Sequence, residues 1–186
     1  SNRAIEILGG KKGTKKPVHP NDHVNASQSS NDSFPTTMHI ASVIQIQKKL
    51  IPSLKEMLSV LQKKTKEFKK IIKIGRTHMQ DATPLTLGDE FSGYTEQIKN
   101  DLSNIEKTYK KMLALAQGGT AVGTGINTPK GFENKFISHL KKITKISFYS
   151  SKNKFESLSF HGPIVDTSAT LNNLAISLMK IGNDIQ

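Results

Sequence analysis

The segment LGDEFSGYTEQIKNDLSNIEKTYKKMLALA, residues 87–116, carries the strongest helical pattern of the chain. Apolar residues recur along it about every 3.6 residues, which is the period of an α-helix; they are Leu87, Phe91, Tyr94, Ile98, Leu102, Ile105, Tyr109, Met112 and Ala116. A helix of this length would run roughly 45 Å. Because one face is apolar throughout, we expect it to pack against partners of similar length.

Weaker patterns of the same period predict further helices on both sides. Residues 35–61 read as a helix that Pro52 interrupts or restarts, residues 131–146 as another, and the stretch from 154 to 186 as a last one with a kink at Pro163. The segment KIIKIGRT, 70–77, is short and β-branched, which predicts a strand or an extended connector. The glycine-rich segment 118–127 predicts a tight loop or a short β excursion. The fold class expected is therefore all-α, with mainly long helices.

Composition excludes several classes of protein. The chain of 186 residues has no cysteine, so it has no disulfide, no thiolate zinc site, no Cys nucleophile and no Cys-ligated iron–sulfur cluster. Its apolar stretches are far too short to span a bilayer, so we expect a soluble protein. The residues at both ends look like parts of longer helices, and we expect the chain to be a piece of a longer protein.

The net charge of +12 favours an anionic partner, whether nucleic acid, an acidic membrane or a small anionic substrate. Between Lys48 and Lys73 the lysines alternate with leucines, as expected for the solvent-facing side of a helix. Trp is absent and there are only 3 Tyr, so no surface for stacking bases is apparent. The charge pattern therefore favours a small anion over nucleic acid.

Two polar segments near the start of the chain allow two interpretations each. HPNDHVN, residues 19–25, has the residues of a turn, but it is also dense in side chains that can bind an anion. Residues 27–33, SQSSNDS, precede a predicted helix and can cap it. The polar run is longer than a cap requires, and together with the free N–H groups of a helix start it would form a cradle for a carboxylate.

A third polar segment, GRTHMQDATP, residues 75–84, places His78 beside Thr77 and Arg76. An imidazole titrates near neutral pH, so His78 is a candidate general acid or base, although a lone histidine is more often structural. The remaining candidates, His39, His139 and His161, lie within helical patterns, and we expect them to be structural.

Six runs, in order along nearly the whole chain, resemble the class II fumarate hydratases of the aspartase/fumarase superfamily. They are HPNDHVN (19–25), SQSSND (27–32), FPTTMHIA (34–41), GRTHMQDATP (75–84), GGTAVGTGIN (118–127) and NKFES (153–157). The Thr77-His78 pair is the form found in fumarases, whereas aspartases resemble the pattern but carry Gln at the position of His78. The absence of cysteine agrees with this resemblance, because the unrelated class I fumarases require an iron–sulfur cluster.

The resemblance implies a site and a reaction, the reversible hydration of fumarate to (S)-malate in the tricarboxylic acid cycle. It assigns Ser29, Ser30, Asn31 and Thr77 to the substrate carboxylates and His78 to proton transfer. His19, Pro20, Asn21 and Asp22 would form a second anion site, often called the B site. No metal or organic cofactor is implied.

The resemblance also implies an architecture. The family has a central domain of long helices that assembles into a homotetramer with a twenty-helix core and with active sites shared between subunits. Residues 1–186 would be part of that domain, without the N-terminal domain and without the later loop that carries a catalytic Ser together with the C-terminal domain. A cytoplasmic location is expected, or a mitochondrial matrix one, with neither membrane nor nucleic acid as a partner. Two alternatives remain: another lyase of the superfamily, such as aspartate ammonia-lyase, and a basic helical scaffold that binds nucleic acid.

Overall fold

The computed structural model describes all 186 residues, which divide into two compact units. Each unit is built from two separate stretches of the chain. The first comprises Ser1–Ala41 and Leu113–His161, and the second comprises Ser42–Met112 and Gly162–Gln186. The expectation of a mainly helical fold is confirmed, with short strands added to the helices.

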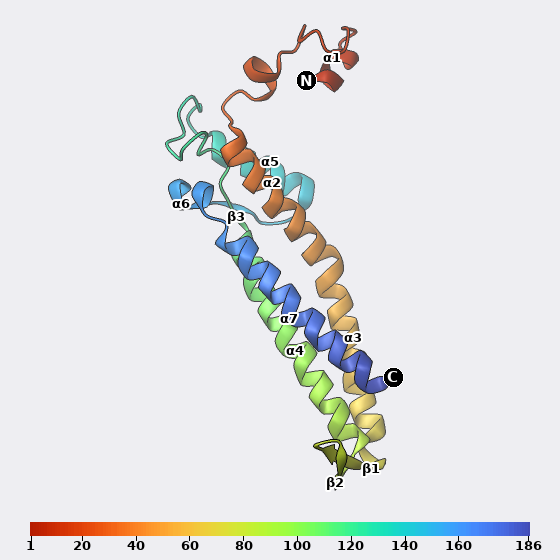
Figure 1. Ribbon diagram of the computed structural model, residues 1–186. Helices are drawn as coiled ribbons and strands as arrows, with labels where there is room; N and C mark the ends of the chain where they lie inside the picture. Colours follow the sequence, from red (N-terminus) through yellow and green to blue (C-terminus); the bar gives the residue numbers. More distant parts are fainter. The chain divides into compact units, whose positions relative to one another are not determined.

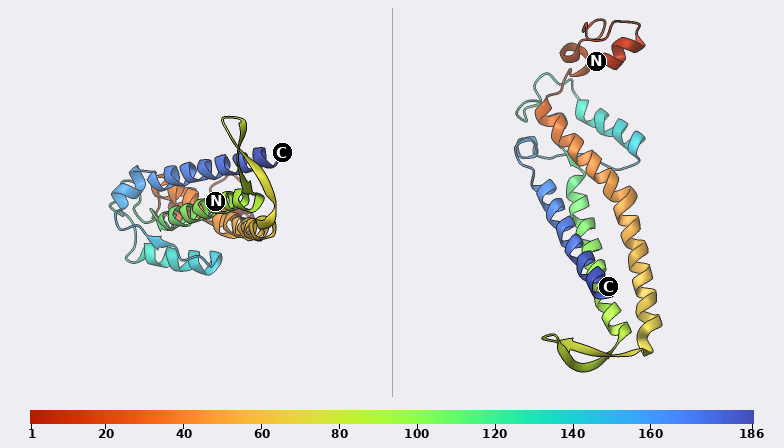
Figure 2. Two further views of the ribbon diagram at one scale, coloured as in Figure 1. Left: turned by 90° about the horizontal axis from the view of Figure 1, so that it is seen from below. Right: turned by 45° about the vertical axis from the view of Figure 1, so that its right-hand side comes forward.

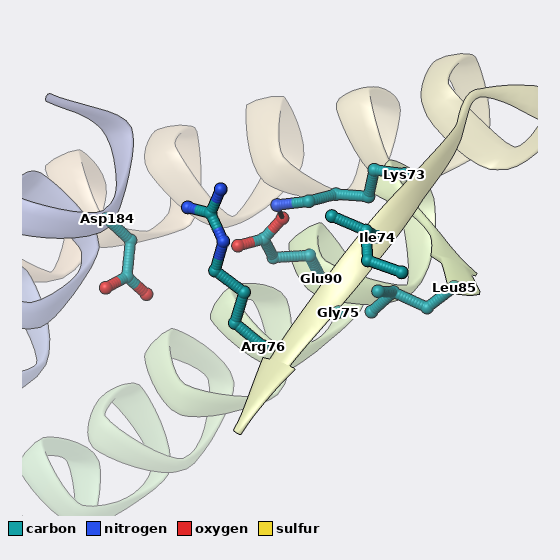
Figure 3. Close-up of a pocket in the computed structure, with 7 residues that line it drawn as sticks. All are labelled: Lys73, Ile74, Gly75, Arg76, Leu85, Glu90 and Asp184. Carbon is teal, nitrogen blue, oxygen red and sulfur yellow. Dashed lines mark hydrogen bonds and ion pairs between the residues drawn. The ribbon is translucent and has the colours of Figure 1, made fainter. Parts of the chain in front are cut away.

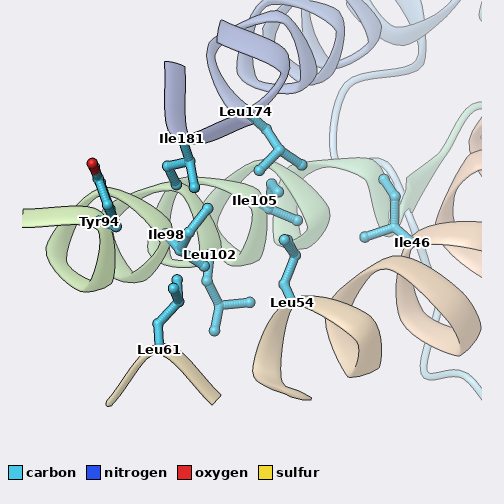
Figure 4. Packing of buried hydrophobic residues seen from close by; sticks show 9 residues of the cluster. All are labelled: Ile46, Leu54, Leu61, Tyr94, Ile98, Leu102, Ile105, Leu174 and Ile181. Carbon is cyan, nitrogen blue, oxygen red and sulfur yellow. The ribbon is translucent and has the colours of Figure 1, made fainter. Parts of the chain in front are cut away.

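Three long helices form the second unit: α3 (Ile51–Glu67), α4 (Leu87–Met112) and α7 (Gly162–Ile185). Helix α4 packs against both α3 and α7, and Figures 1 and 2 show the three lying side by side. The apolar stripe of α4 faces inward, so that Ile98 is 0% exposed and Ile105 is 1% exposed. Figure 4 shows this core: Ile46, Leu54, Leu61, Tyr94, Ile98, Leu102, Ile105, Leu174 and Ile181. Burial of each large aliphatic side chain stabilises the unit by about 1.5–3 kcal/mol.

The helical backbone continues through Pro52. Helix α2 (Ser30–Gln45) leads into a π-helical turn, η2 (Ile46–Leu50), and then into α3, while Gln45, Leu50 and Ile51 all keep right-handed helical dihedrals. Proline cannot donate a backbone hydrogen bond and its ring crowds the preceding turn. The wider π turn accommodates this, and the N–H of Ile51 donates to the carbonyl of Ile46.

Helix α4 starts with a reciprocal cap. The backbone N–H of Thr86 donates to Asp89 Oδ2 at 2.9 Å, and the N–H of Asp89 donates to Thr86 Oγ1 at 3.0 Å. This is a capping box, which satisfies two of the free N–H groups at a helix start. The hydrogen bonds from Thr86 hold the pKa of the Asp89 carboxyl below its usual value.

The helix ends earlier than its apolar period predicts. It stops at Met112, and Ala114–Leu115 form a short strand, β3, that pairs in parallel with β4 (Tyr149–Ser150). The carbonyl of Leu115 accepts from the N–H of Ser151 at 2.9 Å. Leu115 and Ala116 are buried as the period requires, but they are buried as extended backbone in the first unit. The prediction of helix through Ala116 was therefore wrong in its last turn.

Strands β1 (Ile72–Thr77) and β2 (Gln80–Thr86) join α3 to α4 as an antiparallel hairpin. The strand expected at 70–77 is confirmed. A register shift at Gly75 marks a bulge, where a Cβ atom would lie only 2.7 Å from the carbonyl oxygen of Thr83. Glycine is required there because the opposite strand approaches so closely.

The first unit contains short helices and loops: α1 (Asn2–Ile7), the π-helical turn η1 (Pro20–Val24), α5 (Phe132–Thr144) and α6 (Lys154–Ser159). The predicted helix near 131–146 and the predicted loop at 118–127 are both confirmed. The kink expected at Pro163 is wrong. The helix instead breaks at Phe160–His161, and Pro163 is the second residue of α7, where its missing N–H would have no partner in any case.

We expect Ile98→Ala to lower the free energy of unfolding of the protein that contains this chain by about 2–5 kcal/mol, because it leaves a cavity in the α4 core. Chemical denaturation measures this loss. Lys99, whose side chain is 58% exposed, is the matched control on the same helix, and Lys99→Ala should change the stability by about 0.5 kcal/mol or less. Equal losses in the two variants would contradict this assignment of the core.

Candidate functional site

The polar run at 27–33 caps helix α2 and leaves part of its polar groups exposed. Ser29 caps α2, because its hydroxyl accepts a hydrogen bond from the N–H of Asn31 at 3.2 Å. Ser30 and Asn31 lie in the first turn and remain exposed. The Asn31 amide donates to the carbonyl of Ala121 at 2.8 Å, which ties the helix start to the glycine-rich loop. The exposed polar groups at the start of this 16-residue helix can face an anion.

A buried carboxylate, Asp32, stands behind this exposed cradle. It is 0% exposed and accepts from the backbone N–H groups of Ser29 at 2.9 Å, Gly118 at 3.1 Å and Thr120 at 2.9 Å. The Gln117 amide also donates to it, at 3.3 Å. Asp32 is not among the site residues that the sequence predicts. The Ser-x-x-Asp spacing of a capping box indicates its bond to Ser29, but no local pattern indicates its bonds to residues almost ninety positions away.

Lys154 is the second nearly buried charge of this unit, with a side chain that is 12% exposed. It follows Asn153, the N-cap of α6, and reaches back to the segment after α4. Its Nζ donates to the carbonyls of Leu115 at 2.9 Å and Gln117 at 3.0 Å and to the Ser150 hydroxyl at 2.6 Å. Burial lowers the pKa of the Lys154 ammonium, and the nearby Glu133 carboxylate opposes that shift. The NKFES run therefore contributes a structural cation.

The His19–Asn25 segment forms a compact turn, as the simpler interpretation predicts. The Nδ1 atom of His19 accepts hydrogen bonds from the N–H groups of Asn21 and Asp22, both at 3.3 Å. The neutral ring therefore carries its proton on Nε2. His19 Nδ1 also lies 3.1 Å from the Asp22 carboxylate. Asn21 and Asp22 are exposed, and Pro20 is half-buried.

One cleft of the first unit brings together groups from two of the predicted sites. It has a volume of about 550 Å³ and is lined by Asn21, Asn25, Ala26, Ser27, Gln28, Ser29, Thr120, Ala121, Ile126 and Asn127. Asn21 belongs to the predicted second anion site and Ser29 to the predicted carboxylate cradle. The lining is mainly hydroxyl and amide groups, which suits a small polar anion.

Thr77 and His78 lie in the second unit, at the tip of the β1–β2 hairpin. Thr77 pairs with Gln80, which leaves His78 and Met79 as a two-residue loop. Their φ angles are +52° and +60°, the left-handed pair of a type I′ turn. Both residues are exposed, and Met79 is 93% exposed. The structure therefore presents the His78 imidazole to solvent and does not enclose it within the unit.

The strand that leads to this tip is anchored on α4. Lys73 is ion-paired with Glu90. The Tyr94 hydroxyl lies within hydrogen-bonding distance of two carboxylates, 3.1 Å from Glu90 and 3.0 Å from Asp184, and can donate its one proton to either. Burial raises the pKa of the Tyr94 hydroxyl, and these hydrogen bonds raise it further. Figure 3 shows the Lys73 ammonium beside the Glu90 carboxylate and the Arg76 side chain between Glu90 and Asp184. The base of the hairpin is thus held by charge pairing while its tip stays exposed.

The other histidines have different surroundings. His39 is buried on α2, with Nδ1 2.9 Å from the carbonyl of Ala114, while His139 and His161 are exposed. The chain holds no cluster of three or more His, Asp or Glu side chains that could bind a metal ion. None of its helices combines the length and the apolar character needed to cross a bilayer.

Comparison with known proteins agrees with this fold and with these motifs. A family model described as "Lyase" matches residues 1–186. A mitochondrial fumarate hydratase of Rhizopus oryzae is 57% identical over 186 residues, all of this chain and 38% of that protein. A class II fumarate hydratase of Rickettsia bellii is 60% identical over 183 residues, 98% of this chain and 40% of that protein.

Solved structures give the same result. The crystal structure of class II fumarase from Schistosoma mansoni superposes with a TM-score of 0.92 at 40% identity, over 99% of this chain and 42% of that one. A fumarate lyase:delta crystallin from Brucella melitensis superposes with a TM-score of 0.89 at 36% identity, over 99% of this chain and 40% of that one.

These matches define a lyase by fold and by motif. The chain belongs to the lyase family, and the resemblance to class II fumarate hydratases is confirmed. The chain spans about two fifths of the length of the relatives it matches, 38% and 40% of the two proteins compared. The roles of its individual residues remain predictions.

Because Met79 has a left-handed backbone, we expect its side chain to decide the stability of the turn. Met79→Val should lower the free energy of unfolding by about 1–2 kcal/mol, since a β-branched residue is strained at positive φ. Met79→Gly should not lower it, because glycine adopts this conformation freely. Thermal unfolding measures both, and equal destabilisation by Val and Gly would contradict the turn geometry.

Proposed function

We propose that the chain supplies substrate-binding and proton-transfer groups to a fumarate hydratase, which adds water reversibly to fumarate to give (S)-malate. The observation that carries the proposal is the exposed polar cradle at the start of α2, braced by the buried Asp32. The relatives named as fumarate hydratases, at 57% and 60% identity, support it. A role in the tricarboxylic acid cycle follows from this reaction.

The chemistry of the reaction accounts for the cradle. In the dehydration direction, a weakly acidic proton is removed from the carbon beside a carboxylate, and negative charge accumulates on that carboxylate. Donors aimed at the developing charge stabilise the transition state. We assign this role to Ser29, Ser30 and Asn31, aided by the N-terminus of α2, and we add Thr77 from the hairpin.

We assign His78 to proton transfer at the departing hydroxyl or the incoming water. As a general acid it would protonate the departing hydroxyl through a bound water molecule, and in the reverse direction it would take up that proton as a base. The turn supports this role by its position, because it holds the imidazole at the exposed tip of the hairpin. Its left-handed φ of +52° is one that histidine adopts more readily than most non-glycine residues.

The remaining assignments complete the proposal. His19, Pro20, Asn21 and Asp22 form the second anion site, and the shared cleft that Asn21 and Ser29 line supports its position near the cradle. The whole protein acts as a homotetramer, without metal or organic cofactor, in the cytoplasm or the mitochondrial matrix. Many large apolar side chains of α7 are exposed in the single chain, among them Ile176 (52%) and Met179 (62%), which supports assembly with further copies.

We expect His78→Asn, in the complete protein that contains this chain, to reduce malate turnover by about 10²–10⁴-fold, because it removes the acid–base group. The absorbance of fumarate follows the reaction. The oligomer should persist on gel filtration, since the side chain is exposed at a hairpin tip. His139→Asn, an exposed histidine on α5, is the matched control and should keep full activity.

Full activity of the His78 variant would contradict the assignment. Release of ammonia from aspartate with little turnover of malate by the wild-type protein would replace the proposed reaction with that of an aspartase. Tight and steeply salt-dependent binding of DNA would favour the nucleic-acid alternative, whereas a flat titration in moderate salt removes it.

A further inference from the structure

We propose that Asp32 and Lys154 are positioning residues for the substrate cradle, which hold the segment Gln117–Ala121 from its two sides so that Ser29 and Asn31 keep the orientation that binds a carboxylate. This inference rests on the proposed function for its catalytic consequence. Its structural part stands on the contacts of the first unit alone.

The N–H side of the segment is held by Asp32. The N–H groups of Gly118 and Thr120 both point to Oδ2 of this carboxylate, at 3.1 and 2.9 Å, and the Gln117 side chain donates to the same atom. Hydrogen bonds to an ionised acceptor are about twice as strong as neutral ones. Three donors on one buried oxygen therefore define the path of this glycine-rich backbone closely.

The carbonyl side is held by Lys154. Its ammonium donates to the carbonyls of Leu115 and Gln117, at 2.9 and 3.0 Å, just before the residues that bond to Asp32. The segment thus runs between a cation, which donates hydrogen bonds to carbonyl groups, and an anion, which accepts hydrogen bonds from N–H groups. Burial lowers the pKa of Lys154, and the Glu133 carboxylate, 3.4 Å from its Nζ, together with the weaker influence of Asp32, opposes that shift.

Both charges connect to the cradle. Asp32 uses its other oxygen, Oδ1, to accept from the N–H of Ser29 at 2.9 Å. The end of the held segment, the carbonyl of Ala121, accepts from the Asn31 amide at 2.8 Å. Ser29 and Asn31 are therefore fixed from both directions by the same assembly. A displacement of the segment would move the Asn31 amide away from the carboxylate that it is proposed to hold, and the substrate would then bind less tightly.

The test compares Asp32→Asn and Lys154→Met in the complete protein, with malate as substrate. We expect each variant to raise KM about tenfold or more while kcat changes less than about threefold, because binding of the carboxylate is weakened in the ground state and in the transition state alike. Lost folding alone would instead lower kcat per mole of protein at an unchanged KM. The double variant should be no worse than the poorer single variant, since both residues act through one segment.

Lys152→Met is the matched control for Lys154, because Lys152 is exposed two residues earlier. It should leave KM unchanged. An unchanged KM in both Asp32→Asn and Lys154→Met overturns the proposal, as does a KM raised equally by Lys152→Met. Where Asp32→Asn does not fold, as judged by circular dichroism, Lys154→Met decides by the same criteria.

Amide hydrogen exchange separates this inference from the proposed function. The N–H groups of Gly118 and Thr120 should exchange at least about tenfold faster in Lys154→Met than in the wild-type protein, and Lys152→Met should leave them unchanged. A wild-type protein inactive on malate and fumarate would remove the proposed function and leave this exchange test standing. Unchanged protection in both Asp32→Asn and Lys154→Met would overturn the positioning role whatever the reaction proves to be.

Discussion

Burial of the apolar stripe of α4 is the constraint on which the second unit depends. Ile98 and Ile105 are almost completely enclosed because α3 lies on one side of the helix and α7 on the other. A helix that is apolar along its whole length cannot be covered by a short partner, so two other long helices are required. The hairpin follows from this arrangement, because α3 and α4 run antiparallel and the chain must turn back between them. The exposed position of His78 is therefore a consequence of helix packing.

The first unit is organised by charge to a much greater extent. Its helices are short, and its glycine-rich loop has few apolar side chains with which to pack. Buried charges are stable only when hydrogen bonds or ion pairs compensate them. Asp32 accepts several N–H hydrogen bonds, and Lys154 is hydrogen-bonded and ion-paired with Glu133. Such a network is demanding, because removal of one member leaves the others buried without partners. It also defines a single backbone path, which an apolar contact could not do for a loop rich in glycine.

This contrast explains how far the sequence predicts the structure. The apolar period along the chain predicts α4 and its partner helices, and β-branched residues predict the strand at 72–77. The end of α4 at Met112 could not be predicted from the apolar period. Leu115 would be buried in a helix as well as in a strand, and its strand pairing depends on Ser151, which lies far along the sequence. Asp32 shows the same limit. Its local bond to Ser29 has a recognisable spacing, whereas its bonds to Gly118 and Thr120 depend on the fold.

The two halves of the proposed chemistry have opposite structural requirements, and the chain meets each of them separately. A carboxylate cradle must be rigid, since its donors act only when they are already aimed at the developing charge; Ser29 and Asn31 gain this rigidity from the buried network behind them. A proton-transfer group must instead reach water, and His78 stands on an exposed turn. Neither the cleft at Ser29 nor the hairpin tip holds both kinds of group by itself. The cradle has no imidazole and the imidazole has no enclosing wall, so each needs groups that its own unit does not supply.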